Sequence, residues 1–195
     1  MNKRIIGVLV LLLLLSGCAS GEKLFAEKKV KIAEEYVTMD VTVEDFLKNK
    51  SVISFDNLGK TLTSKDTMIC DLGAYRVVVY NANKEDLSID ECLVLGISQN
   101  IQDIEKGTTP IVFPEGLQVG MKISSEELSE KLTSVGEVHG DVGITKDGNV
   151  EYIICGDRWI DLGVDWVSQS GKATYPVEII LEDGVIVSLS MIFID

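Results

Sequence analysis

The chain has 195 residues, with 18 Lys and Arg against 31 Asp and Glu, so its formal net charge is −13. This acidic balance excludes a nucleic-acid-binding surface, which needs clustered Lys and Arg to neutralise phosphates. The one His in the chain excludes metal sites built on two His and leaves little material for Ser-His or Cys-His catalysis.

The N-terminus has the pattern of a secretory signal peptide. Lys3 and Arg4 precede an apolar run from Ile5 to Leu15, and small residues follow it. Its 11 residues would reach only about 16 Å as a helix, at ~1.5 Å per residue, against a hydrocarbon core of roughly 30 Å. A membrane-spanning helix is therefore not expected here.

The end of this run, Leu15, Ser16, Gly17 and Cys18, resembles the lipobox of bacterial lipoproteins. The resemblance implies transfer of a diacylglycerol to the Cys18 thiol and cleavage after Gly17 by the lipoprotein signal peptidase, which recognises Leu15, Ser16 and Gly17. Two or three acyl chains anchor a protein firmly, whereas a single chain binds only marginally. We expect a protein anchored to the cell membrane by lipid, outside the cytoplasm, on the extracellular surface or in the periplasm. The alternative is an ordinary secretory signal with an incidental Cys.

Cleavage after Gly17 would remove Lys3 and Arg4 but no acidic residue, which leaves 178 residues with a net charge of −15. A body of that charge should stand off an anionic bilayer. The predicted organisation is a signal peptide (1–17), a lipidated Cys with a flexible spacer (18–29), an N-terminal strand-rich α+β half (30–106), a seam (107–116) and a C-terminal α+β half (117–195).

The first half predicts one short helix among strands. Val37, Met39, Val41 and Val43 alternate as in a half-buried strand, and the pattern from Thr42 to Asp45 is that of a helix N-cap. Further strands are expected at 51–55, 67–71, 75–81 and 91–98, with turns at 57–59 and 81–83.

The second half repeats this order. Residues 121–127 match residues 39–45 in pattern, and Ser124 with Glu127 forms a capping box for a helix whose buried face holds Leu128, Leu132 and Val135, with Gly136 at its end. Strands are expected at 141–145, 149–155, 158–166, 176–182 and 185–193, with Asp-Gly turns at 147–148 and 183–184. The predicted class is α+β and strand-rich, with short helices packed on small antiparallel sheets; an internal duplication into two similar halves is left open.

The last predicted strand has apolar residues on both faces. Alternation assigns one set to the core: Val185, Val187, Leu189, Met191 and Phe193. The other set mixes Ser188 and Ser190 with apolar residues. It either meets a partner or belongs to a central strand that is buried on both faces.

Residues 116–121 (Gly-Leu-Gln-Val-Gly-Met), the capped helix and Gly136-Glu137 resemble the domain of beta-lactamase-inhibitory-protein-like and small outer-membrane-assembly lipoproteins, over about 110–195. Val138 stands where that family usually carries a Pro. The resemblance implies a helix on a small antiparallel sheet and a role in protein–protein contacts, with no functional residue to carry over. The first half looks like the strand-rich N-terminal region of uncharacterised surface lipoproteins with this domain.

Three cysteines follow Cys18. Cys70, Cys92 and Cys155 each lie in an apolar run, and none belongs to a C-x-x-C pair. They are expected to be small buried hydrophobic residues; the alternative is one disulfide, Cys70–Cys92.

The segment 158–166 holds the candidate contact residues. As a strand it would turn Ile160, Leu162, Val164 and Trp166 to the core, and Trp159, Asp161, Gly163 and Asp165 to the other face. Trp159 with Asp161 and Asp165 is the predicted partner contact, because Trp is enriched in binding hot spots. The alternative is that another part of the chain covers Trp159. A calcium site at Asp157, Asp161 and Asp165 is disfavoured, since carboxylates along a straight strand do not converge on an ion.

No catalytic constellation accompanies these residues. His139 stands near Asp141 without a nucleophile motif such as G-x-S-x-G, and no phosphate-binding Gly-rich loop is present. No catalytic residue, cofactor or metal is predicted. The favoured function is a non-enzymatic lipoprotein that acts as a protein-interaction or adaptor module, with another envelope protein as partner. A small-ligand- or cation-binding lipoprotein is the alternative, and an envelope enzyme using His139 a remote one.

Overall fold

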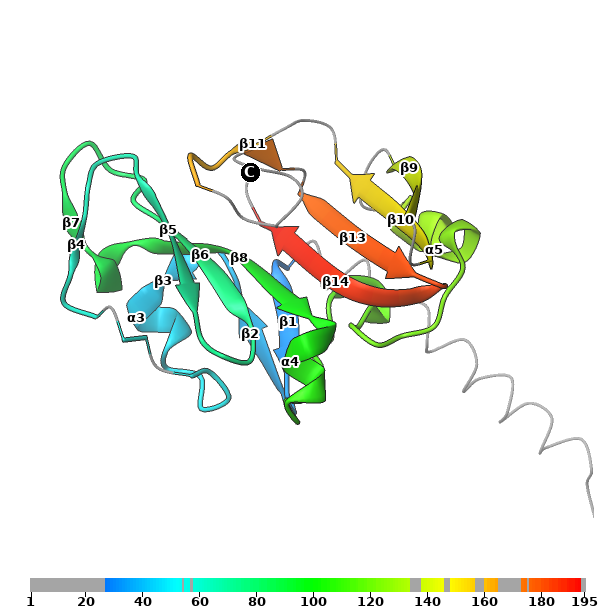
Figure 1. The fold of residues 1–195 in the computed structure, drawn as a ribbon. Coiled ribbons are helices and arrows are strands. Elements are labelled where there is room, and N and C mark those ends of the chain that lie inside the picture. The colour runs from blue at the N-terminus through cyan, green and yellow to red at the C-terminus, as the bar shows by residue number, and fades with distance from the viewer. Residues whose placement is uncertain are drawn as a thin grey trace, which may run out of the picture.

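Antiparallel strands dominate the computed structural model (Figure 1), which describes residues 27–53, 55–56, 58–133, 138–145, 148–156, 160–164, 173–174 and 176–193. The strands are β1 (Lys29–Ile32), β2 (Glu35–Thr38), β3 (Val41–Thr42), β4 (Thr61–Leu62), β5 (Thr67–Asp71), β6 (Arg76–Tyr80), β7 (Leu87–Ser88), β8 (Leu93–Asn100), β9 (Val138–Thr145), β10 (Gly148–Cys155), β11 (Ile160–Asp161), β12 (Ala173–Thr174), β13 (Val177–Glu182) and β14 (Val185–Ile192). The α-helices are α3 (Val43–Phe46), α4 (Ile101–Glu105) and α5 (Ser125–Leu132), and the 3-10 turns are η1 (Ile89–Glu91) and η2 (Pro114–Gly116). The predicted strand-rich α+β class is confirmed.

The largest sheet joins the two predicted halves. Its seven main strands follow the order β5-β6-β8-β14-β13-β10-β9, and β3 pairs with β8 as the eighth. The junction is the antiparallel pair β8–β14, in which Ser98 lies opposite Ser190. Three separate two-stranded sheets, β1–β2, β4–β7 and β11–β12, complete the strand pairing of the described residues.

The two halves are arranged alike around this junction. In the first, β3 pairs with the start of β8 and leads into α3; in the second, Lys122 bridges Val185 at the start of β14 and leads into α5. The last strand of each half is eight residues long, and these two strands pair with each other. An internal duplication would produce this arrangement. The predicted seam, 107–116, contains most of the segment that follows α4 and the whole of η2, and Val112 within it forms a bridge with Lys31.

Both predicted helix starts are confirmed by their caps. The Asp45 amide donates to Thr42 Oγ1 at 3.2 Å, and the Glu127 amide donates to Ser124 Oγ at the same distance, which satisfies one otherwise unpaired N–H in each first turn. The Ser124 amide in turn donates to the Glu127 side chain, which completes the capping box. Leu128 and Leu132 are buried as expected, whereas Val135 and Gly136 lie outside the described residues.

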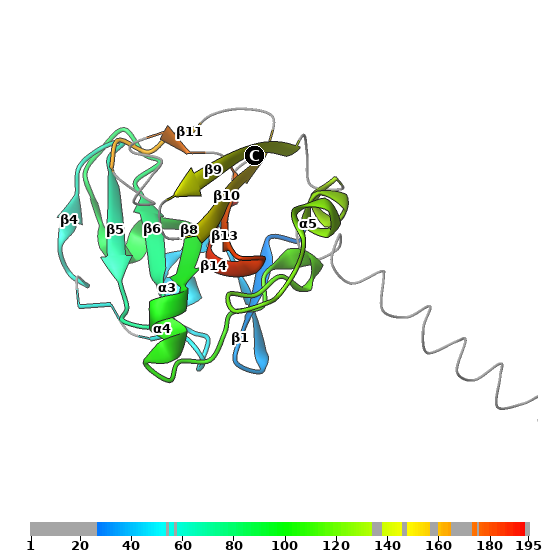
Figure 2. The ribbon, with the colours of Figure 1, turned by 45° about the vertical axis from the view of Figure 1, so that its right-hand side comes forward.

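Apolar side chains cover both faces of the sheet. On the first face the main core includes large buried side chains from α3, α5, the residue after β2 and the segment 111–117, and Figure 2 shows where these elements lie. These side chains are Met39, Phe46, Ile111, Phe113, Leu117, Leu128 and Leu132. A smaller cluster on the second face combines Val78, Leu95, Ile180 and Ile192 with Leu162 from the segment after β11. The sheet is therefore a middle layer with a thick cover on one side and a thin one on the other.

The alternation predicted for residues 185–193 is wrong at the start of β14. Ile180 pairs with Ser188 but Leu181 pairs with Ile186, so Val187 is an extra residue without an opposite partner. This bulge shifts the side-chain alternation, and Ile186 joins the main core while Val187 packs with the second cluster. From Ser188 to Phe193 every residue is buried, because β14 is a central strand with both faces covered; that alternative is confirmed.

The strand predicted at 51–55 is wrong, because its described residues form a turn and an irregular segment. Side chains hold this loop: the Ser51 amide and hydroxyl donate to Glu35 Oε2, and the Ile53 amide donates to the Tyr75 hydroxyl at 3.2 Å. This segment is apolar because it contributes to the core, where Phe55 is buried. In contrast, the Asp183-Gly184 turn is confirmed; both residues have positive φ, as a two-residue hairpin loop of this type requires.

Gly96 makes the β8–β14 junction sensitive to a single methyl group. A Cβ added there would overlap Ile192 Cδ1 and lie 2.9 Å from the Met191 carbonyl oxygen. We expect Gly96→Ala to lower the free energy of unfolding by about 1–3 kcal/mol, as overpacking does, measured by urea denaturation. Adding Ile192→Val removes the clashing Cδ1 and should restore part of the loss. Unchanged stability of Gly96→Ala would contradict the close packing at this junction.

Candidate interaction site

Asp161 is the one predicted contact residue that the structure describes. Trp159, Asp165 and the lipidation residues Leu15, Ser16, Gly17 and Cys18 lie outside the described residues, as do Asp157 and Trp166. The backbone of His139 lies in β9, opposite Ile154.

Asp161 is exposed at the end of the short strand β11. Only Ile160 and Asp161 are in strand conformation among the described residues of 158–166, so the single long strand predicted there is wrong. The chain turns instead, because Gly163 has a φ of 70° and its amide donates to Asp161 Oδ1 at 2.9 Å. The predicted sides nevertheless hold for the described residues: Ile160, Leu162 and Val164 pack on the second cluster, and Asp161 and Gly163 are exposed.

A cleft of about 380 Å³ lies between this segment and the sheet, and we call it the Asp161 cleft. One wall consists of residues 160–163. The other described lining residues come from the first half of the chain: Lys65, Asp66, Thr67, Tyr80 and Leu95. The cleft thus combines an apolar floor with charged residues that belong to distant parts of the sequence.

The turn that carries Lys65 and Asp66 is held by a buried side chain. Asn81 is fully buried, and its Nδ2 donates to the carbonyl oxygens of Leu62, Thr63 and Glu85 at 2.8–3.2 Å. The Asn83 amide donates to Asn81 Oδ1 at 2.9 Å, which closes the expected turn at 81–83. The backbone of Lys65 adopts a left-handed conformation with a φ of 60°, which is rare for residues other than glycine.

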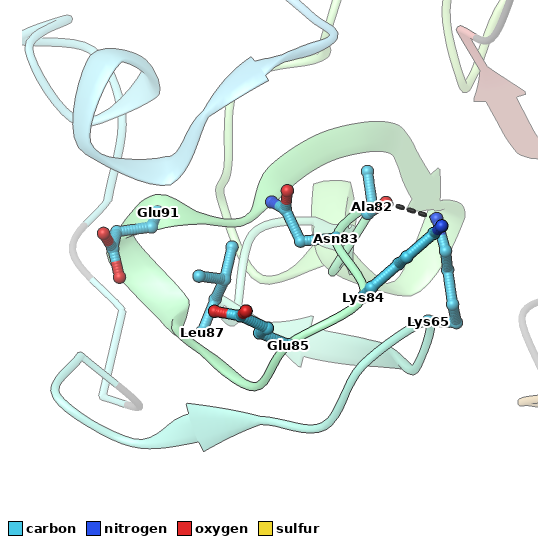
Figure 3. A pocket seen from close by; sticks show the side chains of 7 residues that line it. All are labelled: Lys65, Ala82, Asn83, Lys84, Glu85, Leu87 and Glu91. Carbon is cyan, nitrogen blue, oxygen red and sulfur yellow. Dashed lines mark hydrogen bonds between the residues drawn. The ribbon is translucent and has the colours of Figure 1, made fainter.

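A wider hollow of about 760 Å³ lies beside the cleft and shares Lys65 with it (Figure 3). Lys84, Glu85 and Glu91 also line it, so its two positive and two negative side chains balance. Figure 3 shows the Lys65 ammonium turned to the Ala82 carbonyl oxygen, to which it donates a hydrogen bond. The balanced charge and polar lining give this hollow no preference for a ligand of one sign.

The three cysteines of the body are buried thiols, as the favoured alternative predicts, and the Cys70–Cys92 disulfide is not formed. Burial raises the pKa of the Cys92 thiol, and the negative charges of Glu91 and Asp90 raise it further. This thiol therefore stays protonated near neutral pH, and a protonated thiol is a poor nucleophile.

Metal-ligating side chains do not gather in the described ranges: no group of three or more His, Cys, Asp or Glu is placed to hold an ion there. Nor does any helix among these ranges have the length and apolar character needed to cross a membrane.

Fold and cleft together define an α+β protein with a charged, apolar-floored cleft on the thinly covered face of its sheet. Comparison of the chain with models of known families, with curated proteins and with solved structures finds no match.

Sequence reasoning missed Lys65, Asp66 and Tyr80. Ser64, Lys65 and Asp66 had the polar character of a connection between strands, and nothing local indicated a site. Their role depends on a segment almost a hundred residues further along the chain, and only tertiary structure brings it there.

Proposed function

We propose that this protein is a lipid-anchored, non-enzymatic lipoprotein of the cell envelope whose α+β body binds another envelope protein. The observation that carries the proposal is the exposed Asp161 at the rim of a cleft with an apolar floor. Binding surfaces commonly combine a desolvated apolar centre with charged groups at its edge. Trp159 lies two residues before Asp161 in the sequence and would supply the aromatic anchor.

The proposed anchor suits this role. Eleven peptide units connect Cys18 to Lys29, the first residue of β1, and a chain of that length spans at most about 40 Å when fully extended. The body would carry a net charge of −15 after cleavage, so repulsion from anionic lipid should hold it away from the bilayer. A tethered body with exposed faces can then meet a neighbouring envelope protein.

The cleft also supports a second candidate, a lipoprotein that binds a small ligand. A volume of about 380 Å³ lies within the usual range of small-molecule sites, roughly 300–1,000 Å³. A reproducible thermal shift with one sugar, peptide or metal ion, lost on changing Asp161, would favour this function over the first.

A crosslinked pull-down from native envelopes tests the favoured function. The baits are the lipidated protein, its Trp159→Ala variant and a Tyr36→Ala control, which removes an exposed aromatic side chain from β2. We expect a stoichiometric partner with the unchanged protein and with Tyr36→Ala, and its loss with Trp159→Ala. Recovery of the same proteins by all three baits, or of none, would count against the adaptor function.

A further inference from the structure

We propose that the Asp161 cleft receives a single basic side chain, Arg or Lys, from a segment of the partner protein. This inference rests on the proposed function and names the chemistry that the partner presents. It follows from the carboxylates, the floor and the position of Lys65 in the cleft.

Two carboxylates line the cleft from segments that are far apart in the sequence. Asp66 precedes β5, and Asp161 ends β11. Each uses one oxygen locally: the Thr67 amide donates to Asp66 Oδ1 and the Gly163 amide to Asp161 Oδ1, both at 2.9 Å. These bonds fix both carboxylates, and within the described part of the chain neither enters an ion pair. In each carboxylate Oδ2 remains available to a cation that enters the cleft.

The floor suits the stem of a long basic side chain. Leu95 and Leu162 are 7% and 6% exposed and form part of the second apolar cluster, to which Ile160 and Tyr80 add. Arg and Lys bury their methylene groups on apolar surface while the charged head stays at a polar edge. The ring of Tyr80 adds a face that attracts cations, most strongly a guanidinium.

Among the lining residues that the structure describes, Lys65 is the one basic side chain, and it leaves this position open. Lys65 donates its ammonium proton to the Ala82 carbonyl oxygen in the neighbouring hollow (Figure 3), and it pairs with neither Asp66 nor Asp161. The described part of the lining therefore contains two carboxylates and a lysine that is engaged elsewhere. The net charge of −13 over the whole chain further favours an approaching cation.

An NMR titration of the soluble 19–195 body tests the proposal with defined probes. The tripeptide acetyl-Ala-Arg-Ala-amide is compared with its norleucine counterpart, which keeps the apolar stem and lacks the charge. Asp66→Asn and Asp161→Asn remove the charges but retain Oδ1 as the acceptor of the local backbone bonds. Asp56→Asn is the matched control, because Asp56 is exposed and outside the cleft lining.

We expect the arginine peptide to shift the Gly163 amide and Tyr80 ring resonances, and the norleucine peptide to bind more weakly. The double Asp→Asn variant should bind the arginine peptide about tenfold more weakly, and Asp56→Asn should bind it unchanged. Equal binding of both peptides, or an unchanged affinity in the double variant, would overturn the proposal. Agmatine bound as tightly as the peptide would also overturn it, because the occupant would then be a small-molecule cation and not a side chain of a partner protein.

The titration and the pull-down test separate claims, so one can give a negative result while the other gives a positive one. A partner that is lost with Trp159→Ala, together with no response to the arginine peptide, would leave the adaptor function intact and show that the basic occupant is wrong.

Discussion

A Cys18→Ser variant is expected to lose its acyl anchor completely. The lipobox resemblance makes the Cys18 thiol the acceptor of the diacylglycerol, and a serine hydroxyl does not replace a thiol as nucleophile in that transfer. Without acyl chains the acidic body has no means of binding an anionic bilayer, so the protein should be released or remain uncleaved.

Labelling with radioactive palmitate followed by fractionation measures this effect. The unchanged protein should carry the label in the membrane fraction, and Cys18→Ser should carry none. Cys70→Ala serves as the control, because it removes a cysteine that is buried in the body and should leave labelling intact. Label persisting on Cys18→Ser would refute lipidation at this residue.

Phe46→Ala should produce the largest loss of stability, about 3–5 kcal/mol. Phe46 is the last residue of α3 and has no exposed surface. Its ring lies 6.2 Å from that of Phe55, between centroids, at an interplanar angle of 31°. Truncation would remove this pair and leave a cavity in the main core, below the first face of the sheet.

Urea denaturation of the soluble body gives the free energy of unfolding. Phe46→Leu should cost less than Phe46→Ala, since it refills part of the volume, and Lys50→Ala, at an exposed position after the helix, should stay within about 0.5 kcal/mol. A loss for Phe46→Ala no larger than that for Lys50→Ala would show that the core does not depend on this ring.

Features that depend on neighbouring residues were predictable. The capping patterns at Thr42–Asp45 and Ser124–Glu127 are local hydrogen bonds, and both predicted helices begin there. The Asp183-Gly184 turn was likewise evident, because positive φ at both positions favours these residue types.

The errors fall where distant contacts override a local pattern. Residues 51–55 look like a strand in the sequence, but Ser51 and Ile53 donate hydrogen bonds to Glu35 and Tyr75 that hold them in a loop, and Phe55 is buried in the core. The bulge at Val187 cannot be read from alternation, since it arises from the register between β13 and β14. The candidate site follows the same rule: Asp161 was identified, but Asp66 was not, because its role depends on a wall from the other half of the chain.

The sequence by itself determined the strand-rich α+β class, the helix starts and the expectation of a lipid anchor, because each depends on residues close together in the chain. The tertiary structure decided that β8 and β14 pair and so join both halves in one sheet. It also decided that the segment after β11 covers the second face and forms the Asp161 cleft. These contacts join residues about ninety positions apart, and no local propensity encodes them; they form because strand edges must pair and apolar faces must be covered.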